Sequence, residues 1–203
     1  MKSLRLYHYS AEDGAAFGKA LTDYLESSGR SGLAAACQKE PAVFRRGEHG
    51  KPYFFGHGLE DVFFSRSDTR GHAIVCFSDA EIGLDCENTR ARPGIETRAG
   101  AIAKRCFTEN ERAYLDSDSH GAARRFFEIW TAKEAYMKYT GRGFSEGFRT
   151  FSVFDLPCVR IETGLLPDAP HVVYSVCTGD AGENVEVVHH SELTGGEYGA
   201  KNE

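Results

Sequence analysis

The sequence has no apolar run long enough to cross a membrane and no pair of cysteines spaced to bind a metal. No segment approaches the roughly 18 apolar residues of a membrane helix, including the stretch that follows residues 1–10. The six cysteines form no Cys-x-x-Cys pair and no Cys/His cluster, so we expect neither a zinc site nor a disulfide framework. These absences predict a cytoplasmic protein with reduced thiols and no membrane partner.

An excess of basic residues is also missing. The chain has 24 Lys and Arg against 30 Asp and Glu, which gives a net charge of -6. Proteins that neutralise many phosphates usually carry a positive excess, so we expect no nucleic-acid partner and only local recognition of phosphate. With 203 residues, of which 41% are hydrophobic, the chain can form one sizeable domain or two small halves that share a core.

Residue patterns predict a mixed α+β protein without regular alternation of strands and helices. Helices are expected at residues 12–25, 95–106, 109–115 and 122–140. Ser10 is suited to cap the first helix, residues 27–32 interrupt it, and Gly141 is suited to end the last one. Strands are expected at residues 53–55, 61–67, 72–78, 81–87, 148–154, 158–162, 171–177 and 184–190, and residues 191–203 are expected to be disordered.

The first chemical signal is a pair of acids in the strand predicted at residues 81–87. Alternation along a strand points Ile82, Leu84 and Cys86 into a core and places Asp85 and Glu87 together on the other face. The two carboxylates are then about 7 Å apart, close enough to bind one hard cation such as Mg²⁺. The alternative is a solvated polar face, which is the commoner role of such a pair in isolation.

The second signal is an acid on the aromatic face of the helix predicted at residues 122–140. Helical spacing places Glu134 on one stripe with Phe127 and Trp130, and Lys138 follows one turn later. The alternative role of Glu134 is a surface ion pair with Lys138. Taken together, three carboxylates and a lysine, without a cysteine or histidine cluster, favour phosphoryl chemistry with a hard metal.

These segments are similar to sequences of the surfactin-type 4′-phosphopantetheinyl transferases. A W-x-x-K-E-x-x-x-K string preceded by G-x-D-x-E is a specific combination, whereas G-K-P alone is weak. The matching strings occur in the family's order over about residues 50–145: G-K-P at 50–52, F-S-R-S at 64–67, I-G-L-D-C-E at 82–87, F-T-E-N-E at 107–111 and W-T-A-K-E-A-Y-M-K at 130–138.

The resemblance implies an α+β fold of two similar lobes related by pseudo-twofold symmetry, with the site between them. We expect an N-terminal lobe at residues 1–80, a C-terminal lobe with metal-binding carboxylates at 81–192, and a disordered tail at 193–203. The implied activity is transfer of the 4′-phosphopantetheine group from coenzyme A to a serine of an acyl or peptidyl carrier protein, with release of 3′,5′-ADP.

The resemblance also implies roles for individual residues. Asp85, Glu87 and Glu134 would hold Mg²⁺, and Lys138 would neutralise the pyrophosphate or the leaving group. Glu134, or a water beside it, would help to deprotonate the carrier serine, and Glu111 matches a position that assists.

Coenzyme A has its own implied contacts. Lys51 and Pro52 would lie by the adenine, and Ser65 to Ser67 would approach the 3′-phosphate. Arg66 stands where the family usually has histidine, and an arginine can grip a phosphate with two hydrogen bonds while staying charged.

Two further departures concern the surroundings of that pocket. Residues 68–71 form a longer turn than the family's, and the first third lacks an Arg-rich helix. Substitutes for that helix are Arg30, Lys39, Arg45 and Arg46, although solvated surface charge is the better interpretation of each. Two other functions stay open: a Mg²⁺-dependent phosphohydrolase, and a diverged paralogue that binds coenzyme A or a carrier without transfer.

Overall fold

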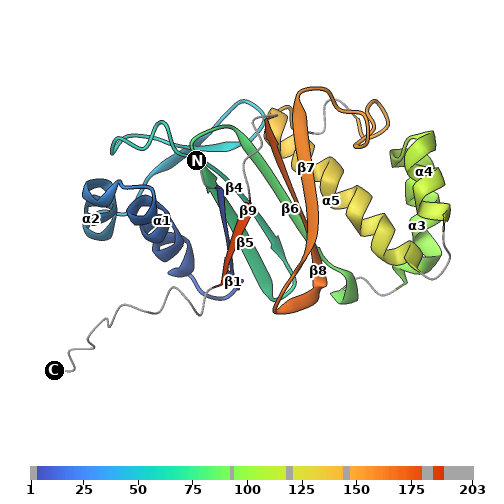
Figure 1. The fold of residues 1–203 in the computed structure, drawn as a ribbon, viewed down its shortest axis with the longest axis horizontal. Helices are drawn as coiled ribbons and strands as arrows, with labels where there is room; N and C mark the ends of the chain where they lie inside the picture. Colours follow the sequence, from blue (N-terminus) through green and yellow to red (C-terminus); the bar gives the residue numbers. More distant parts are fainter. Residues whose placement is uncertain (1–3, 92–93, 118–120, 144–146, 180–184, 190–203) are drawn as a thin grey trace.

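The computed structural model of the protein describes residues 4–91, 94–117, 121–143, 147–179 and 185–189 (Figure 1). Its strands are β1 (Leu4–Ser10), β2 (Phe44–Arg46), β3 (Pro52–Phe54), β4 (Phe63–Thr69), β5 (His72–Ser78), β6 (Ile82–Asn88), β7 (Val159–Leu166), β8 (Ala169–Gly179) and β9 (Val185–His189). Its helices are α1 (Ala16–Ser27), α2 (Ser31–Lys39), the short 3-10 helix η1 (Thr89–Ala91), α3 (Ile95–Cys106), α4 (Glu109–Asp116) and α5 (Ala122–Thr140). None of the helices in these ranges has the length and apolar character needed to cross a membrane.

The α+β fold is confirmed, and its two main sheets share one connectivity. In the first sheet, of order β4-β5-β1-β9, an antiparallel β4–β5 pair places β5 beside the opening strand β1. In the second, of order β6-β8-β7, an antiparallel β7–β8 pair places β8 beside the opening strand β6. The repeated pattern is what two similar lobes require. Strand β9 joins the first sheet, parallel to β1, although it follows the second sheet in sequence.

The sheets form the middle layers of the molecule, and helices cover their outer faces (Figure 1). Neighbouring residues of β1 show this layering, because successive side chains of a strand point to opposite faces. Tyr7 packs in the core between the first sheet and α1, whereas Leu6 packs in the core between the two sheets. A third core joins α3, α4 and α5 to the outer face of the second sheet, where Val173 lies.

Helix α5 lies directly against β6, and a glycine permits this close packing. A Cβ atom on Gly83 would overlap the carbonyl oxygen of Ala135 and the backbone nitrogen of Tyr139, both in α5. Ile82, Leu84 and Cys86 pack in the core between the sheets, so the opposite face of β6, with Asp85 and Glu87, is turned toward α5. The predicted division of this strand into two faces is confirmed.

Most predicted elements are present, but several differ for identifiable reasons. Strand β1 was not predicted; it lies between β5 and β9 with both faces largely buried, so it lacks the alternation that marks a half-buried strand. Helix α2 was also missed. The chain breaks near Gly29, which has a positive φ, and α2 then begins at Ser31 with Gly32 in its first turn. Helix α1 begins at Ala16, since Ser10 accepts a hydrogen bond from the amide of Glu12 in the preceding turn.

The strand predicted at residues 148–154 is wrong. These residues form turns and irregular backbone, because the rings of Phe148 and Phe151 pack on α5 and the carbonyl groups of the same two residues face a buried ammonium rather than a neighbouring strand. The tail predicted to be disordered, residues 191–203, lies outside the described residues.

The contact between α5 and β6 can be tested by adding one methyl group. Gly83→Ala should lower the free energy of unfolding by about 1–3 kcal/mol, because the new Cβ meets backbone atoms that cannot move aside. Urea denaturation measures the change. The matched control is Gly100→Ala in α3, where a Cβ meets nothing within 4 Å and which should leave stability unchanged or raise it by up to about 1 kcal/mol. Equal effects of both substitutions would contradict the packing described.

Candidate functional site

The site is organised by a buried carboxylate on β6. Asp85 is 7% exposed and its neighbour on the same face, Glu87, is 8% exposed. A buried charge requires polar partners. Oδ1 of Asp85 accepts a hydrogen bond of 2.8 Å from the hydroxyl of Ser67 on β4, and it lies 2.8 Å from Nζ of Lys138 on α5. Asp85 therefore joins β4, β6 and α5 at one point.

Helix α5 brings a second charged residue to the same place. Glu134 precedes Lys138 by one turn, so both side chains lie on one side of the helix. Glu134 is half-buried and faces a cavity that Lys138 also lines. The ammonium of Lys138 contacts the carbonyl oxygen of Arg66 at 3.5 Å as well as Asp85. Lys138 thus bridges the edge of the cavity and the buried acid.

The cavity has a volume of about 560 Å³ and lies between the β2–β3 hairpin, β4 and the C-terminal half of α5. Its charged lining is mainly basic, with Arg46, Lys51, Arg66 and Lys138 against Asp68 and Glu134. Apolar side chains complete it, namely Phe17, Phe44, Pro52, Phe64 and Met137. Such a mixture suits a ligand that has both an aromatic ring and several phosphate groups.

Lys51 connects the β2–β3 hairpin to the end of α5. Its ammonium forms an ion pair with Glu81 and donates a hydrogen bond of 2.9 Å to the carbonyl oxygen of Tyr139. The helix closes at Gly141, which has a φ of +66° and at which an added Cβ would lie 3.2 Å from Cδ of Lys51. A cation at this end is favoured by the helix dipole, so Lys51 fixes the hairpin against α5.

The serines of β4 are structural as well as close to the cavity. Ser65 lines it, and its hydroxyl accepts a hydrogen bond of 2.9 Å from the amide of Leu84. Between the two serines, Arg66 points outward and bonds to Asp68 at 2.8 Å. Burial opposes the Arg66 cation, but the hydrogen bond to Asp68 raises its pKa overall, so Arg66 stays charged.

Two of the basic residues considered as phosphate contacts have protein partners. Arg30 is paired with Asp61 and Asp79, the latter at 2.8 Å. The guanidinium of Arg45 lies over the ring of Phe55, 3.4 Å from its centroid. Arg46 is the member of that group that lines the cavity.

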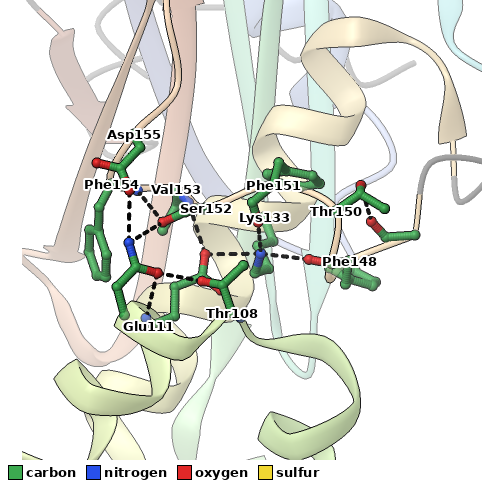
Figure 2. Close-up of polar contacts among 12 residues, drawn as sticks. Thr108, Glu111, Lys133, Phe148, Thr150, Phe151, Ser152, Val153, Phe154 and Asp155 are labelled. Atoms are coloured by element: carbon green, nitrogen blue, oxygen red, sulfur yellow. Dashed lines mark hydrogen bonds and ion pairs between the residues drawn. The ribbon is translucent and has the colours of Figure 1, made fainter.

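Glu111 lies in a different part of the molecule, in the first turn of α4 (Figure 2). It is fully buried and forms an ion pair of 2.9 Å with Lys133. Its two carboxylate oxygens also accept hydrogen bonds from the amides of Thr108 and Val153, each 2.8 Å long. A carboxylate bonded in this way cannot approach a bound substrate, so we assign Glu111 a structural position.

The donor chemistry of the predicted metal ligands suits a hard cation. Asp85, Glu87 and Glu134 supply oxygen atoms alone, which Mg²⁺ prefers. In the described part of the chain, however, no three His, Cys, Asp or Glu side chains are already arranged around one ion position.

Comparison with known proteins identifies the family. The model of the 4′-phosphopantetheinyl transferase superfamily matches residues 81–188, more than half of the chain, including β6 and α5. The chain belongs to this superfamily.

Curated members of the superfamily match the chain to different extents. The 4′-phosphopantetheinyl transferase of Bacillus subtilis is 34% identical over 164 residues, which is 78% of this chain and 67% of the relative. The transferase psf-1 of Bacillus pumilus is 30% identical over 172 residues, covering 75% of this chain and 68% of the relative. The match to the transferase gsp of Aneurinibacillus migulanus has 32% identity and spans only 40% of that relative.

Two features of this transferase-family site were missed in the sequence. Ser67 was expected near a phosphate and not as the hydrogen-bond donor to Asp85, although strand alternation places it on one face with Ser65. The second feature is the burial of Lys133, which is fully buried although a lysine is usually exposed. Its spacing of four residues from Ile129 and four from Met137, both buried, was the available signal.

The orientation of β6 predicts which cysteines react. Cys86 lies between the two acids but points into the core, where burial, followed by the charge of Asp85, raises the pKa of its thiol to about 12. Burial likewise raises the pKa of Cys177 to about 12. Because the thiolate is the reactive form, iodoacetamide at about pH 8 should label the exposed Cys158 in the native protein and leave both buried thiols unmodified.

Peptide mass mapping measures this labelling, and labelling in urea provides the control in which all three cysteines react. If Cys86 were labelled in the native protein as fast as Cys158, β6 would have the opposite face turned to the core, and Asp85 could not meet Lys138.

Proposed function

We propose that the protein transfers the 4′-phosphopantetheine group of coenzyme A to a serine of an acyl or peptidyl carrier protein, which converts the carrier from its apo to its holo form. The observation that carries the proposal is the meeting of Asp85 with Lys138, beside Glu134, at the edge of the basic cavity. Membership of the superfamily supports the same reaction. The relatives are named as 4′-phosphopantetheinyl transferases. The chain spans about two fifths of the length of gsp and about two thirds of the lengths of psf-1 and of the Bacillus subtilis transferase.

The cavity is the proposed binding site of coenzyme A. A volume of about 560 Å³ lies within the range of small-molecule sites. Pro52 and the aromatic side chains Phe44 and Phe64 offer an apolar surface for the adenine, and Lys51 lies beside them. Arg46 and Arg66 line the same cavity and would bind phosphate groups, with Arg66 able to form two parallel hydrogen bonds to one phosphate.

Asp85, Glu87 and Glu134 are the proposed ligands of Mg²⁺. The bound ion would supply positive charge next to the pyrophosphate, as in other phosphoryl-transfer sites. The buried positions of Asp85 and Glu87 favour this role, because two acids on one strand face repel each other unless a cation or a donor lies near. Lys138 supplies that cation in the described structure.

Glu134 and Lys138 have separate roles in the proposed reaction. The hydroxyl oxygen of the carrier serine attacks the β-phosphorus of coenzyme A, and the bond from that phosphorus to the oxygen of 3′,5′-ADP breaks. Glu134 accepts the serine proton, directly or through a water. The ammonium of Lys138 stabilises the negative charge that develops on the phosphate oxygens, which is the main requirement of phosphoryl transfer.

The transfer itself is measured by mass spectrometry of a carrier protein. With coenzyme A and Mg²⁺, the protein should add the mass of phosphopantetheine to an apo acyl or peptidyl carrier. Asp85→Ala should lower the turnover at least about 10²-fold, because it removes a proposed metal ligand and the partner of Lys138. Chelation of the metal should have a similar effect.

The matched control is Asp116→Ala, which removes an exposed aspartate at the end of α4 and should leave transfer unchanged. Failure of the wild-type protein to modify any of several acyl and peptidyl carriers would overturn the proposal. Tight binding of coenzyme A without transfer would identify a non-catalytic binding protein. Release of phosphate or 3′,5′-ADP in the absence of a carrier would identify a hydrolase.

A further inference from the structure

A fully buried lysine lies one residue before the proposed base Glu134 and is not part of the cavity lining. The side chain of Lys133 is 0% exposed, and so is that of its partner Glu111. A lysine is almost never buried to this extent unless its charge is paired. The surroundings of Lys133 therefore show what this charge holds in place.

All three donors of the Lys133 ammonium have acceptors (Figure 2). Nζ donates hydrogen bonds of 2.7 Å to the carbonyl oxygens of Phe148 and Phe151, and it lies 2.9 Å from Oε1 of Glu111. It also lies 4.3 Å from the centre of the Phe151 ring, a cation–π contact. One side chain of α5 thus binds the segment 148–151 and, through Glu111, the start of α4.

The segment that Lys133 holds has no strand or helix of its own. Residues 148–155 are turns and irregular backbone, and their position depends on side chains of α4 and α5. Glu111 accepts a hydrogen bond from the amide of Val153, and Asn110 donates to Ser152 and Asp155 at 2.9 Å and 2.8 Å. We call Lys133, Glu111 and the groups bonded to them the Lys133 network.

The same segment packs on α5 through aromatic rings. Phe148 stacks on Trp130, with ring centroids 5.0 Å apart, and Phe151 packs on Tyr136 at 4.7 Å. Trp130 and Tyr136 flank Lys133 on the helix, so the segment follows the side of α5 that carries Lys133. These contacts restrict rotation of α5 about its own axis.

We propose that Lys133 is a positioning residue of the transfer reaction, which sets the rotation of α5 so that Glu134 and Lys138 face the cavity. Residues in a helix are separated by about 100° of rotation, so fixing the direction of Lys133 fixes that of Glu134 and of Lys138. Gly83 sets how closely α5 approaches β6, and the Lys133 network sets which side of the helix faces the cavity. This inference rests on the function proposed above.

Loss of Lys133 should affect the turnover and the KM for coenzyme A differently. Most residues that line the cavity belong to the first half of the chain, including Lys51, Pro52 and Arg66, and these three are not members of the Lys133 network. Lys133→Met should therefore change the KM for coenzyme A little. The turnover per folded enzyme should fall by about 10²-fold, as expected when reacting groups are displaced by about 1 Å.

A second variant separates positioning from stability. Lys133→Met alone leaves the Glu111 carboxylate buried without its cation, so it should also lower the urea midpoint of unfolding. Lys133→Met combined with Glu111→Gln removes that charge and should recover part of the stability. It should not recover turnover, because the carbonyl groups of Phe148 and Phe151 still lack their donor.

The control is Arg124→Met, which removes an exposed cation paired with Glu128 on the same helix. It should alter neither the KM for coenzyme A nor the turnover. The fraction of folded enzyme is measured by circular dichroism in the far and near ultraviolet before each carrier-loading assay. If turnover per folded enzyme is unchanged in Lys133→Met, or recovers with stability in the double variant, the positioning role is wrong. If the wild-type protein loads no carrier, the failure lies with the proposed function instead.

Discussion

The close contact between α5 and β6 is the constraint on which the site depends. Gly83 permits the backbones to approach, and the ion pair between Asp85 and Lys138 forms two residues further along the strand. The pair is buried at its acidic end, where an unpartnered charge would be costly. A larger residue at position 83 would therefore separate not only two elements but also the two charges that define the site.

Helix α5 has a different partner on each side. Toward β6 it presents Lys138, toward the cavity Glu134, and toward α4 the buried Lys133. These three charged residues lie within two turns of one helix. Their burial increases from Lys138 and Glu134 to Lys133, in line with the roles proposed for them: Glu134 and Lys138 would meet a ligand, whereas Lys133 holds neighbouring segments of the protein in place.

The sequence predicted the parts of the site that local pattern determines. Alternation along residues 82–87 placed Asp85 and Glu87 on one face, and helical spacing placed Glu134 and Lys138 on one side. Contacts between distant segments were not predictable in this way. The donation from Ser67 to Asp85 depends on how β4 packs beside β6, and the burial of Lys133 depends on carbonyl groups 15 and 18 residues away. The prediction of a strand at 148–154 was wrong for the same reason, because contacts with a distant side chain determine the backbone there.

The central claim is that Asp85, Glu87 and Glu134 surround one ion beside a ligand bound in the basic cavity. A crystal structure of the full chain with coenzyme A and Mn²⁺ tests it most directly, because anomalous scattering locates the metal. We expect an anomalous peak in contact with these carboxylates and with the pyrophosphate, and the adenine near Lys51 and Pro52. A metal bound elsewhere, or coenzyme A outside the cavity, would contradict it.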